Sequence, residues 1–274
     1  MAGGAVALAL GAAVLHAVWN LVLARAPDTE AATAVALLMS VAVFALPAAL
    51  SWRVDAAAWP YVAASTMFQF GYVVTLAAAL ARGELSVAYP LARGSAPVLV
   101  LAVSAGVLGA ASSGRQVVGV ALVAAGVLLV RGLRRPPDGR VVALALACGA
   151  CIAGYTVVDS HALDHAAALP YLWIVMALTA SVYVPLAART RGRPALKAAV
   201  RGETVLAAVL FFGAYLLVLA ALRLAEPGPV AAIRETSVVV AVALGYLLLR
   251  EPVTPSRATG SLVVVAGAAV IALS

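Results

Sequence analysis

The sequence predicts an all-α integral membrane protein with ten transmembrane helices, arranged as two inverted five-helix repeats. Three observations carry this prediction. Of the 274 residues, 65% are hydrophobic and only 11% are charged; the chain divides into ten apolar runs; and its second half resembles its first at a fixed offset. So much apolar surface exceeds what a water-soluble domain of this length can bury. The lipid bilayer is therefore an expected partner.

The ten apolar runs are separated by short polar or proline-containing breaks. A hydrocarbon layer about 30 Å thick needs about 20 helical residues per crossing. The expected spans are 3–24, 29–52, 58–82, 86–109, 113–132, 140–160, 169–188, 200–224, 228–249 and 254–273. The sequence contains no ATP-binding loop, so we expect no cofactor and no direct drive by ATP.

An offset of 141 residues relates the two halves of the chain. It superimposes four pairs of arginine, hydroxyl or glycine residues: Arg93 with Arg234, Ser95 with Thr236, Gly119 with Gly260 and Gly126 with Gly267. The predicted domains are a first repeat at 1–132, a basic loop at 133–139 and a second repeat at 140–274. Because five is an odd number of spans, the second repeat must enter the membrane from the opposite side. Such inverted repeats are common in secondary transporters, which bind substrate near the midplane.

Lysine and arginine are distributed unequally between the two faces of the predicted bundle. Thirteen lie in the segments after the first, third, fifth, seventh and ninth spans, and three lie on the opposite face. The positive-inside rule makes the richer face cytoplasmic, which places both termini outside the cell inner (plasma) membrane. Because these residues gather in short loops, the net charge of +7 does not indicate nucleic-acid binding.

Polar side chains inside the predicted spans are the candidate substrate-binding residues, because each is costly at membrane depth unless it is paired or hydrated. They are His16, Trp19, Asn20, Gln69, Tyr72, Tyr89, Arg93, Tyr155, Asp159, Arg234 and Glu235.

The two arginines among these candidates occupy equivalent places near the starts of the fourth and ninth spans. Their planar guanidinium groups could clamp a carboxylate or a phosphate. The structural alternative is that Arg93 pairs with Glu84, and Arg234 with Glu226 or Glu235.

Two prolines, Pro90 and Pro97, are expected to interrupt and kink the fourth span around Arg93. A kink there would help to open a cavity beside the arginine.

In the first span, His16, Trp19 and Asn20 share one helical face, since they are spaced i, i+3 and i+4. Histidine changes charge near neutral pH, which makes His16 a candidate proton carrier alongside Asp159 and Glu235. The alternative is an interhelical hydrogen-bond cluster with no role in transport.

Two further patterns have structural interpretations that we favour. The segment HALDH at 161–165 has a spacing that can bind zinc, but it lacks the glutamate of a zincin helix and indicates a hydrated loop. Cys148 and Cys151 lie in an apolar run, where a thiolate is costly, and indicate small packing residues.

Three stretches resemble the EamA-type members of the drug/metabolite transporter superfamily. They are HAVWN at 16–20, GELSVAYPLARGSAPVLVL at 83–101 and IRETSVVVAVALGYLLLREPVTPSRATG at 233–260. The resemblance implies transport of small metabolites, often export of amino acids, through a central cavity. It also implies cytoplasmic termini, contrary to the charge distribution. Ala110 stands where the second repeat has Glu251, so a symmetric role for that acid is not expected.

Together these features predict a secondary transporter and not an enzyme. We expect export of a small polar organic metabolite, an amino acid or an organic anion, by alternating access in a monomer or homodimer, with proton coupling as an option. The alternatives are a membrane-embedded metal-dependent enzyme and a non-transporting partner subunit.

Overall fold

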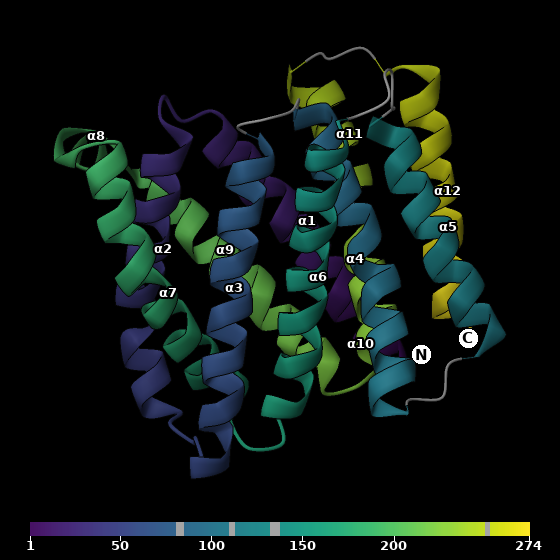
Figure 1. Ribbon diagram of the computed structural model, residues 1–274, viewed down its shortest axis with the longest axis horizontal. Coiled ribbons are helices and arrows are strands. Elements are labelled where there is room, and N and C mark those ends of the chain that lie inside the picture. The colour runs from purple at the N-terminus through teal and green to yellow at the C-terminus, as the bar shows by residue number, and fades with distance from the viewer. Residues whose placement is uncertain (81–84, 110–112, 132–137, 250–252) are drawn as a thin grey trace.

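The computed structural model describes residues 1–80, 85–109, 113–131, 138–249 and 253–274, drawn as ribbons in Figure 1. Its elements in chain order are α1 (Gly3–Ala24), α2 (Thr29–Leu50), the 3-10 turn η1 (Ala56–Ala58), α3 (Trp59–Leu80), α4 (Leu85–Leu108), α5 (Gly114–Arg131), α6 (Gly139–Ala162), α7 (Ala168–Thr190), α8 (Arg193–Ala198), α9 (Gly202–Leu222), α10 (Pro227–Arg234), α11 (Ser237–Leu249) and α12 (Pro255–Ala272).

The described part of the chain is helical apart from one isolated β-bridge between Val54 and Ala166. Seven of its helices are long and apolar enough to cross a membrane, with α10 and α11 counted as one span. Two shorter apolar helices cover Leu91–Gly106 and Gly114–Val130. Large apolar side chains also point outward, including Leu247 at 69% exposure and Leu262 at 71%. An outer surface of this kind suits contact with lipid.

The ninth expected span is broken into α10 and α11 at Glu235 and Thr236. There the Thr236 amide donates to the Ile233 carbonyl at 3.0 Å, and the Thr236 hydroxyl donates to the same carbonyl at 2.7 Å. Tight bonds to the third preceding residue replace the α-helical pattern, and the hydroxyl competes for the backbone acceptor. The sequence pattern did not predict this break.

The fourth expected span is a continuous helix, although an interruption was predicted there. The helix α4 continues through Pro90 and Pro97, so the predicted interruption is wrong. The break occurs in the equivalent segment of the other half, after Arg234.

The helix α8 forms where the sequence suggested only a loop. Gly192 adopts a positive φ of 82° after the end of α7, a conformation that glycine accepts without strain. Pro194 then occupies the first turn of α8, where its missing N–H is harmless, and alanine and leucine extend the helix.

Helices from the first half of the chain pack against helices from the second half. The pairs α5–α12 and α2–α7 pack side by side and lie at opposite sides of the bundle in Figure 1. Between them, α1 packs along α9, and α3 packs along α6. The helix α4 packs against α6, while α1 contacts α10 and α11. The centre of the molecule is therefore built by α1, α4, α6 and α10 together.

Glycines let α5 and α12 approach closely. A Cβ atom added at Gly119 would lie 2.9 Å from the Gly267 carbonyl oxygen, and one at Gly267 would lie 2.7 Å from the Gly119 oxygen. Gly126 and Gly260 meet in the same way, at 2.8 and 2.7 Å. Small residues at such contacts maximise van der Waals packing where lipid supplies no hydrophobic driving force.

Candidate functional site

An ion pair joins the two halves at the centre of the bundle. The Nε atom of Arg93 on α4 lies 3.1 Å from the Oε2 atom of Glu235, which follows α10. Their side chains are only 6% and 1% exposed. A buried charge of either sign is tolerated when an opposite charge stands beside it. The alternative considered for Arg93 was pairing with Glu84, which lies outside the described residues. The acid that the structure places beside Arg93 is Glu235.

Arg234 is buried next to this pair but has no such partner. Its residue exposure is 4%, and within the described ranges no carboxylate lies in ion-pairing range of its guanidinium. Its Nε atom likewise has no hydrogen-bond acceptor among those residues. The structural alternatives of pairing with Glu226 or Glu235 are therefore wrong. The repeat explains the difference, because the position equivalent to Glu235 in the first half is Gly94.

Asp159 on α6 is held by two tyrosines. It is fully buried and accepts a hydrogen bond from the Tyr171 hydroxyl on α7 at 2.5 Å, and a second from the Tyr215 hydroxyl on α9. Each carboxylate oxygen thus has a donor, which a buried polar group needs. Three helices converge on this one side chain.

Aromatic rings connect the arginine to the aspartate. Tyr155 on α6 is buried, as is Arg234, and the two residues are close enough to interact electrostatically. The ring centroid of Tyr155 lies 5.9 Å from that of Tyr215 and 6.5 Å from that of Tyr72, in edge-to-face arrangements. Such geometry is favourable for aromatic pairs. Tyr155 therefore stands between Arg234 and the Tyr215–Asp159 hydrogen bond.

The polar face of α1 approaches the same centre. His16 packs edge-on against Trp19, with ring centroids 5.0 Å apart, and Trp19 packs against Phe211 at 5.3 Å. Arg93 and Arg234 are both near enough for their charges to act on His16. The His16 Nε2 and Trp19 Nε1 atoms have no hydrogen-bond partner in the part of the chain that the structure describes.

The remaining candidates are less involved. The Asn20 amide donates to the His16 carbonyl within α1, at 2.7 Å. Gln69 on α3 is half-buried. Tyr89 lies outside the residues whose side chains are described.

Tyr171 and Tyr215 were not among the candidates predicted from the sequence. Both are tyrosines in apolar runs, so a search for every phenol within a span would have found them. Nothing in the local sequence indicates that they share Asp159, because the three residues lie on different helices.

The HALDH segment and the cysteine pair make structural contacts. His161 Nδ1 bonds the Val157 carbonyl at 3.0 Å, and the His165 ring stacks on Tyr61 with centroids 5.6 Å apart. Both cysteines are free, and a Cβ atom at Gly71 of α3 would lie 2.9 Å from the Cys151 sulfur. Among the described residues, no group of three His, Cys, Asp or Glu side chains could hold a metal ion.

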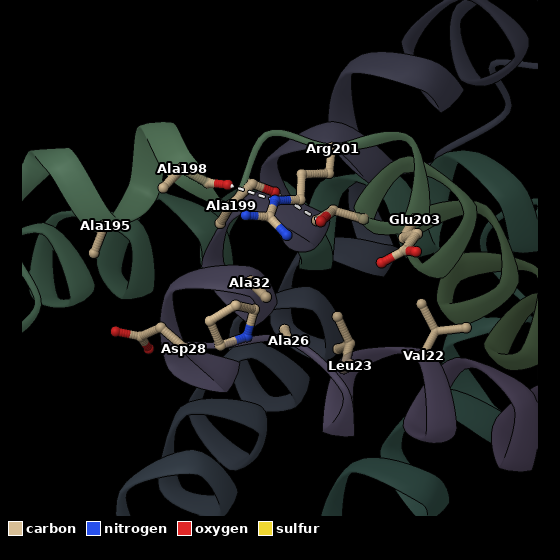
Figure 2. A pocket seen from close by; sticks show the side chains of 12 residues that line it. Val22, Leu23, Ala26, Asp28, Ala32, Ala195, Ala198, Ala199, Arg201 and Glu203 are labelled. Carbon is tan, nitrogen blue, oxygen red and sulfur yellow. Dashed lines mark hydrogen bonds between the residues drawn. The ribbon is translucent and has the colours of Figure 1, made fainter.

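Two cavities lie apart from the central cluster. One of about 100 Å³ lies between the ends of α1, α2, α8 and α9, where Arg201 donates to the Ala198 carbonyl at 3.1 Å (Figure 2). The other, of about 190 Å³, lies between α2, α7 and α8. Neither is bordered by Arg93 or Arg234.

Comparisons with known proteins give a family match for part of the chain and a shared fold. Residues 139–273 match the EamA-like transporter family. No curated protein matches the chain. Among 29 matching chains of solved structures, one described only as a crystal structure of a protein has a TM-score of 0.72 at 18% identity, covering 98% of this chain and 96% of that one. At this identity the likeness shows a shared fold alone.

The family match confirms the resemblance found in the sequence, and with the apolar helices it identifies a multi-pass membrane protein. The EamA family consists of transporters, which agrees with the expectation that this chain is not an enzyme. Residues 139–273 form an EamA-like transporter family domain, which is consistent with membership of the chain in the drug/metabolite transporter superfamily.

Proposed function

We propose that this protein is a secondary transporter that exports a small polar organic metabolite, an amino acid or an organic anion, by alternating access. The observation that carries the proposal is the buried cluster of Arg93, Arg234 and Glu235, where helices of both halves meet beside a helix break. Ionisable groups at membrane depth mark substrate or ion pathways. Discontinuous helices near the midplane are typical of transporter binding sites.

The packing of the helices supports a ten-helix fold with inverted repeats. The offset of 141 residues relates α1 to α6, α3 to α9, and α5 to α12. The contact of α1 with α9 therefore becomes, under exchange of the halves, the contact of α6 with α3, and both contacts are observed. The same exchange converts the Gly119–Gly267 contact into the Gly260–Gly126 contact. An interface of this self-complementary kind is expected from a two-fold axis.

Within this site we assign unequal roles to the two arginines. Glu235 neutralises Arg93, and their ion pair links the halves beside the break. Arg234 keeps guanidinium donors for a carboxylate of the substrate, because Gly94 supplies no acid at the equivalent position. His16, Asp159 and Glu235 are the groups through which proton coupling would act.

The test is flux in proteoliposomes, with and without a pH gradient, across a panel of amino acids and organic anions. We expect wild-type flux of at least one compound, and a loss of roughly tenfold or more in Arg234→Gln, because a hydrogen bond to a charged group contributes about 1.5–3 kcal/mol. Arg115→Gln, which removes an exposed arginine, is the matched control. Absence of flux for the whole panel under both conditions would refute the proposal.

We also propose that the face carrying α8 is cytoplasmic. Both termini lie at the end of the bundle opposite α8 in Figure 1, so this orientation places them outside. The basic segment Arg189–Arg201 lies at the α8 face, which supports the assignment through the positive-inside rule. C-terminal fusions to alkaline phosphatase and to a fluorescent protein should give phosphatase activity and no fluorescence; the reverse result requires the opposite orientation.

A further inference from the structure

The short helix α8 and the two helices it covers form a feature that the proposed transport site does not use. The helix lies at one end of the bundle, in contact with α2 and α7 (Figure 1). Arg193 and Lys197 are spaced i, i+4 along it, and both are exposed. Its other side borders the cavity shown in Figure 2, through Ala195, Ala198 and Ala199.

An apolar groove of about 190 Å³ runs beside α8. Leu38 of α2, Val184 of α7 and Leu196 of α8 line it, and of the described residues Lys197 is the one charged residue in its lining. Leu38 is 50% exposed at this surface. An apolar cavity of about 150 Å³ is large enough to hold benzene, so this groove has room for a stretch of hydrocarbon chain.

The groove lies within about three helical turns of the end of the bundle that carries α8. Leu38 is nine residues beyond the start of α2 at Thr29, and Val184 is six residues before the end of α7 at Thr190. At 1.5 Å per residue these positions lie roughly 9 to 14 Å below the helix ends. A lysine at the mouth can extend its stem over apolar surface and keep its ammonium group at the headgroup level.

The segment from Arg189 to Arg201 carries five basic residues and no acid. Arg191 is bound by Asp28 at 2.8 Å and lies 3.8 Å from Glu30. In the described part of the structure no carboxylate is in ion-pairing range of Arg189, Arg193 or Lys197. Lys197 at the rim of the groove, with Arg189 and Arg193 close to it in the sequence, thus belongs to a cluster of cations without carboxylate counter-ions among the described residues. Clusters of this kind next to a membrane attract anionic lipids.

We propose that this groove binds an anionic phospholipid, with an acyl chain against Leu38, Val184 and Leu196 and the phosphate on Lys197. Arg193, one helical turn before Lys197, faces the same headgroup region. The site is independent of the proposed transport site, so it stands whether or not flux is found.

The experiment measures lipid retention by the purified full-length protein in detergent, using native mass spectrometry and thermal unfolding. Phosphatidylglycerol should be retained more strongly than phosphatidylcholine of the same chains and should raise the melting temperature more. Lys197→Ala should weaken phosphatidylglycerol retention about fivefold and Lys197→Glu more, because one cation near an anionic headgroup contributes about that factor. Leu38→Trp, which fills the groove, should weaken retention of both lipids.

Arg115→Ala is the matched control, since it removes an exposed arginine beyond the groove and should leave retention unchanged. Equal retention of the two lipids, or wild-type retention by Lys197→Ala, overturns the proposal. A rise in melting temperature with inorganic phosphate equal to that with phosphatidylglycerol also overturns it, because the acyl chain would then contribute nothing. Leu38 and Lys197 are exposed, so each variant can be checked for wild-type melting without lipid before the comparison.

Discussion

Arg93 and Glu235 form an ion pair across the two halves of the molecule, with 3.1 Å between Nε and Oε2. The pair ties the continuous helix α4 to the break between α10 and α11. Among the described residues, it leaves Arg234, the repeat-related arginine, without an ion-pairing acid. The chain therefore departs from its internal symmetry at the site that we propose for the substrate.

Removing the acid of this pair should destabilise the fold. Glu235→Gln leaves the Arg93 guanidinium buried without its counter-ion, and breaking a buried pair costs about 3–5 kcal/mol. Thermal unfolding in detergent should show a clear fall in melting temperature. Glu203→Gln, which changes an exposed acid in the first turn of α9, should melt like the wild type. An unchanged melting temperature in Glu235→Gln would mean that the pair contributes nothing to stability.

Close packing of α5 on α12 should not tolerate a methyl group at Gly126. A Cβ atom there would lie 2.7 Å from the Val264 nitrogen and 2.8 Å from the Gly260 oxygen, and backbone atoms cannot move aside alone. We expect Gly126→Ala to destabilise the protein by about 1–3 kcal/mol, as overpacking does. Gly106→Ala is the control, because no atom would lie within 4 Å of the new Cβ. In α4 that change should be neutral or stabilising by about 1 kcal/mol, and equal melting of the two variants would contradict the close contact.

The contribution of Tyr171 and Tyr215 to stability should depend on the Asp159 carboxylate. Tyr171→Phe and Tyr215→Phe each remove one hydroxyl donor, and an unsatisfied buried acceptor costs about 1–3 kcal/mol. The measurement is a double-mutant cycle on melting temperature with Asp159→Asn. The effect of each phenylalanine substitution should shrink when the carboxylate is already gone. Full additivity of the two changes would show that the hydrogen bonds are not the source of the loss.

The surface pair of Asp28 and Arg191 should make a small, pH-dependent contribution. The pKa of Asp28 is lowered, first by the Ala31 backbone N–H and then by the Arg191 side chain. A carboxyl whose pKa falls on folding stabilises the native state above its unfolded value of about 3.9, and loses that effect as the pH falls through the folded value.

Asp28→Asn keeps a residue that caps α2 and removes the charge. Its melting temperature should lie slightly below that of the wild type at neutral pH, and the gap should close as the pH falls through the lowered pKa of Asp28. A gap that stays the same at low pH would show that the charge is not responsible. The effect is small because exposed ion pairs are screened by solvent.

The positions of most helices could be predicted from the sequence. The run expected at 3–24 is α1 at Gly3–Ala24, and the run expected at 254–273 is α12 at Pro255–Ala272. Apolar length and the breaks between runs are local properties, and hydrocarbon requires a helix wherever the chain crosses it. The offset of 141 residues also pairs Gly119 with Gly260 and Gly126 with Gly267 in the sequence, and all four glycines lie in the contact of α5 with α12.

The arrangement of the candidate site could be predicted only in part. The arginines, Asp159 and Glu235 stand out because charges are rare in apolar runs. Their partners do not, since Tyr171 and Tyr215 reach Asp159 from helices far along the chain. The helix α8 was not predicted, because a segment of six residues is too short to show the periodic apolar pattern of a helix.

What the sequence determined by itself is the helical, membrane-spanning character of the chain, its resemblance to the EamA-like family and the few charged residues within its apolar runs. The hydrophobicity of a segment depends only on the residues of that segment, so it can be calculated from the sequence without the fold. Only the tertiary structure decided that Glu235 pairs with Arg93 and not with its neighbour Arg234, that Asp159 is held by two tyrosines, and that Lys197 of α8 borders an apolar groove. These depend on distances between helices, which the order of residues along the chain does not contain.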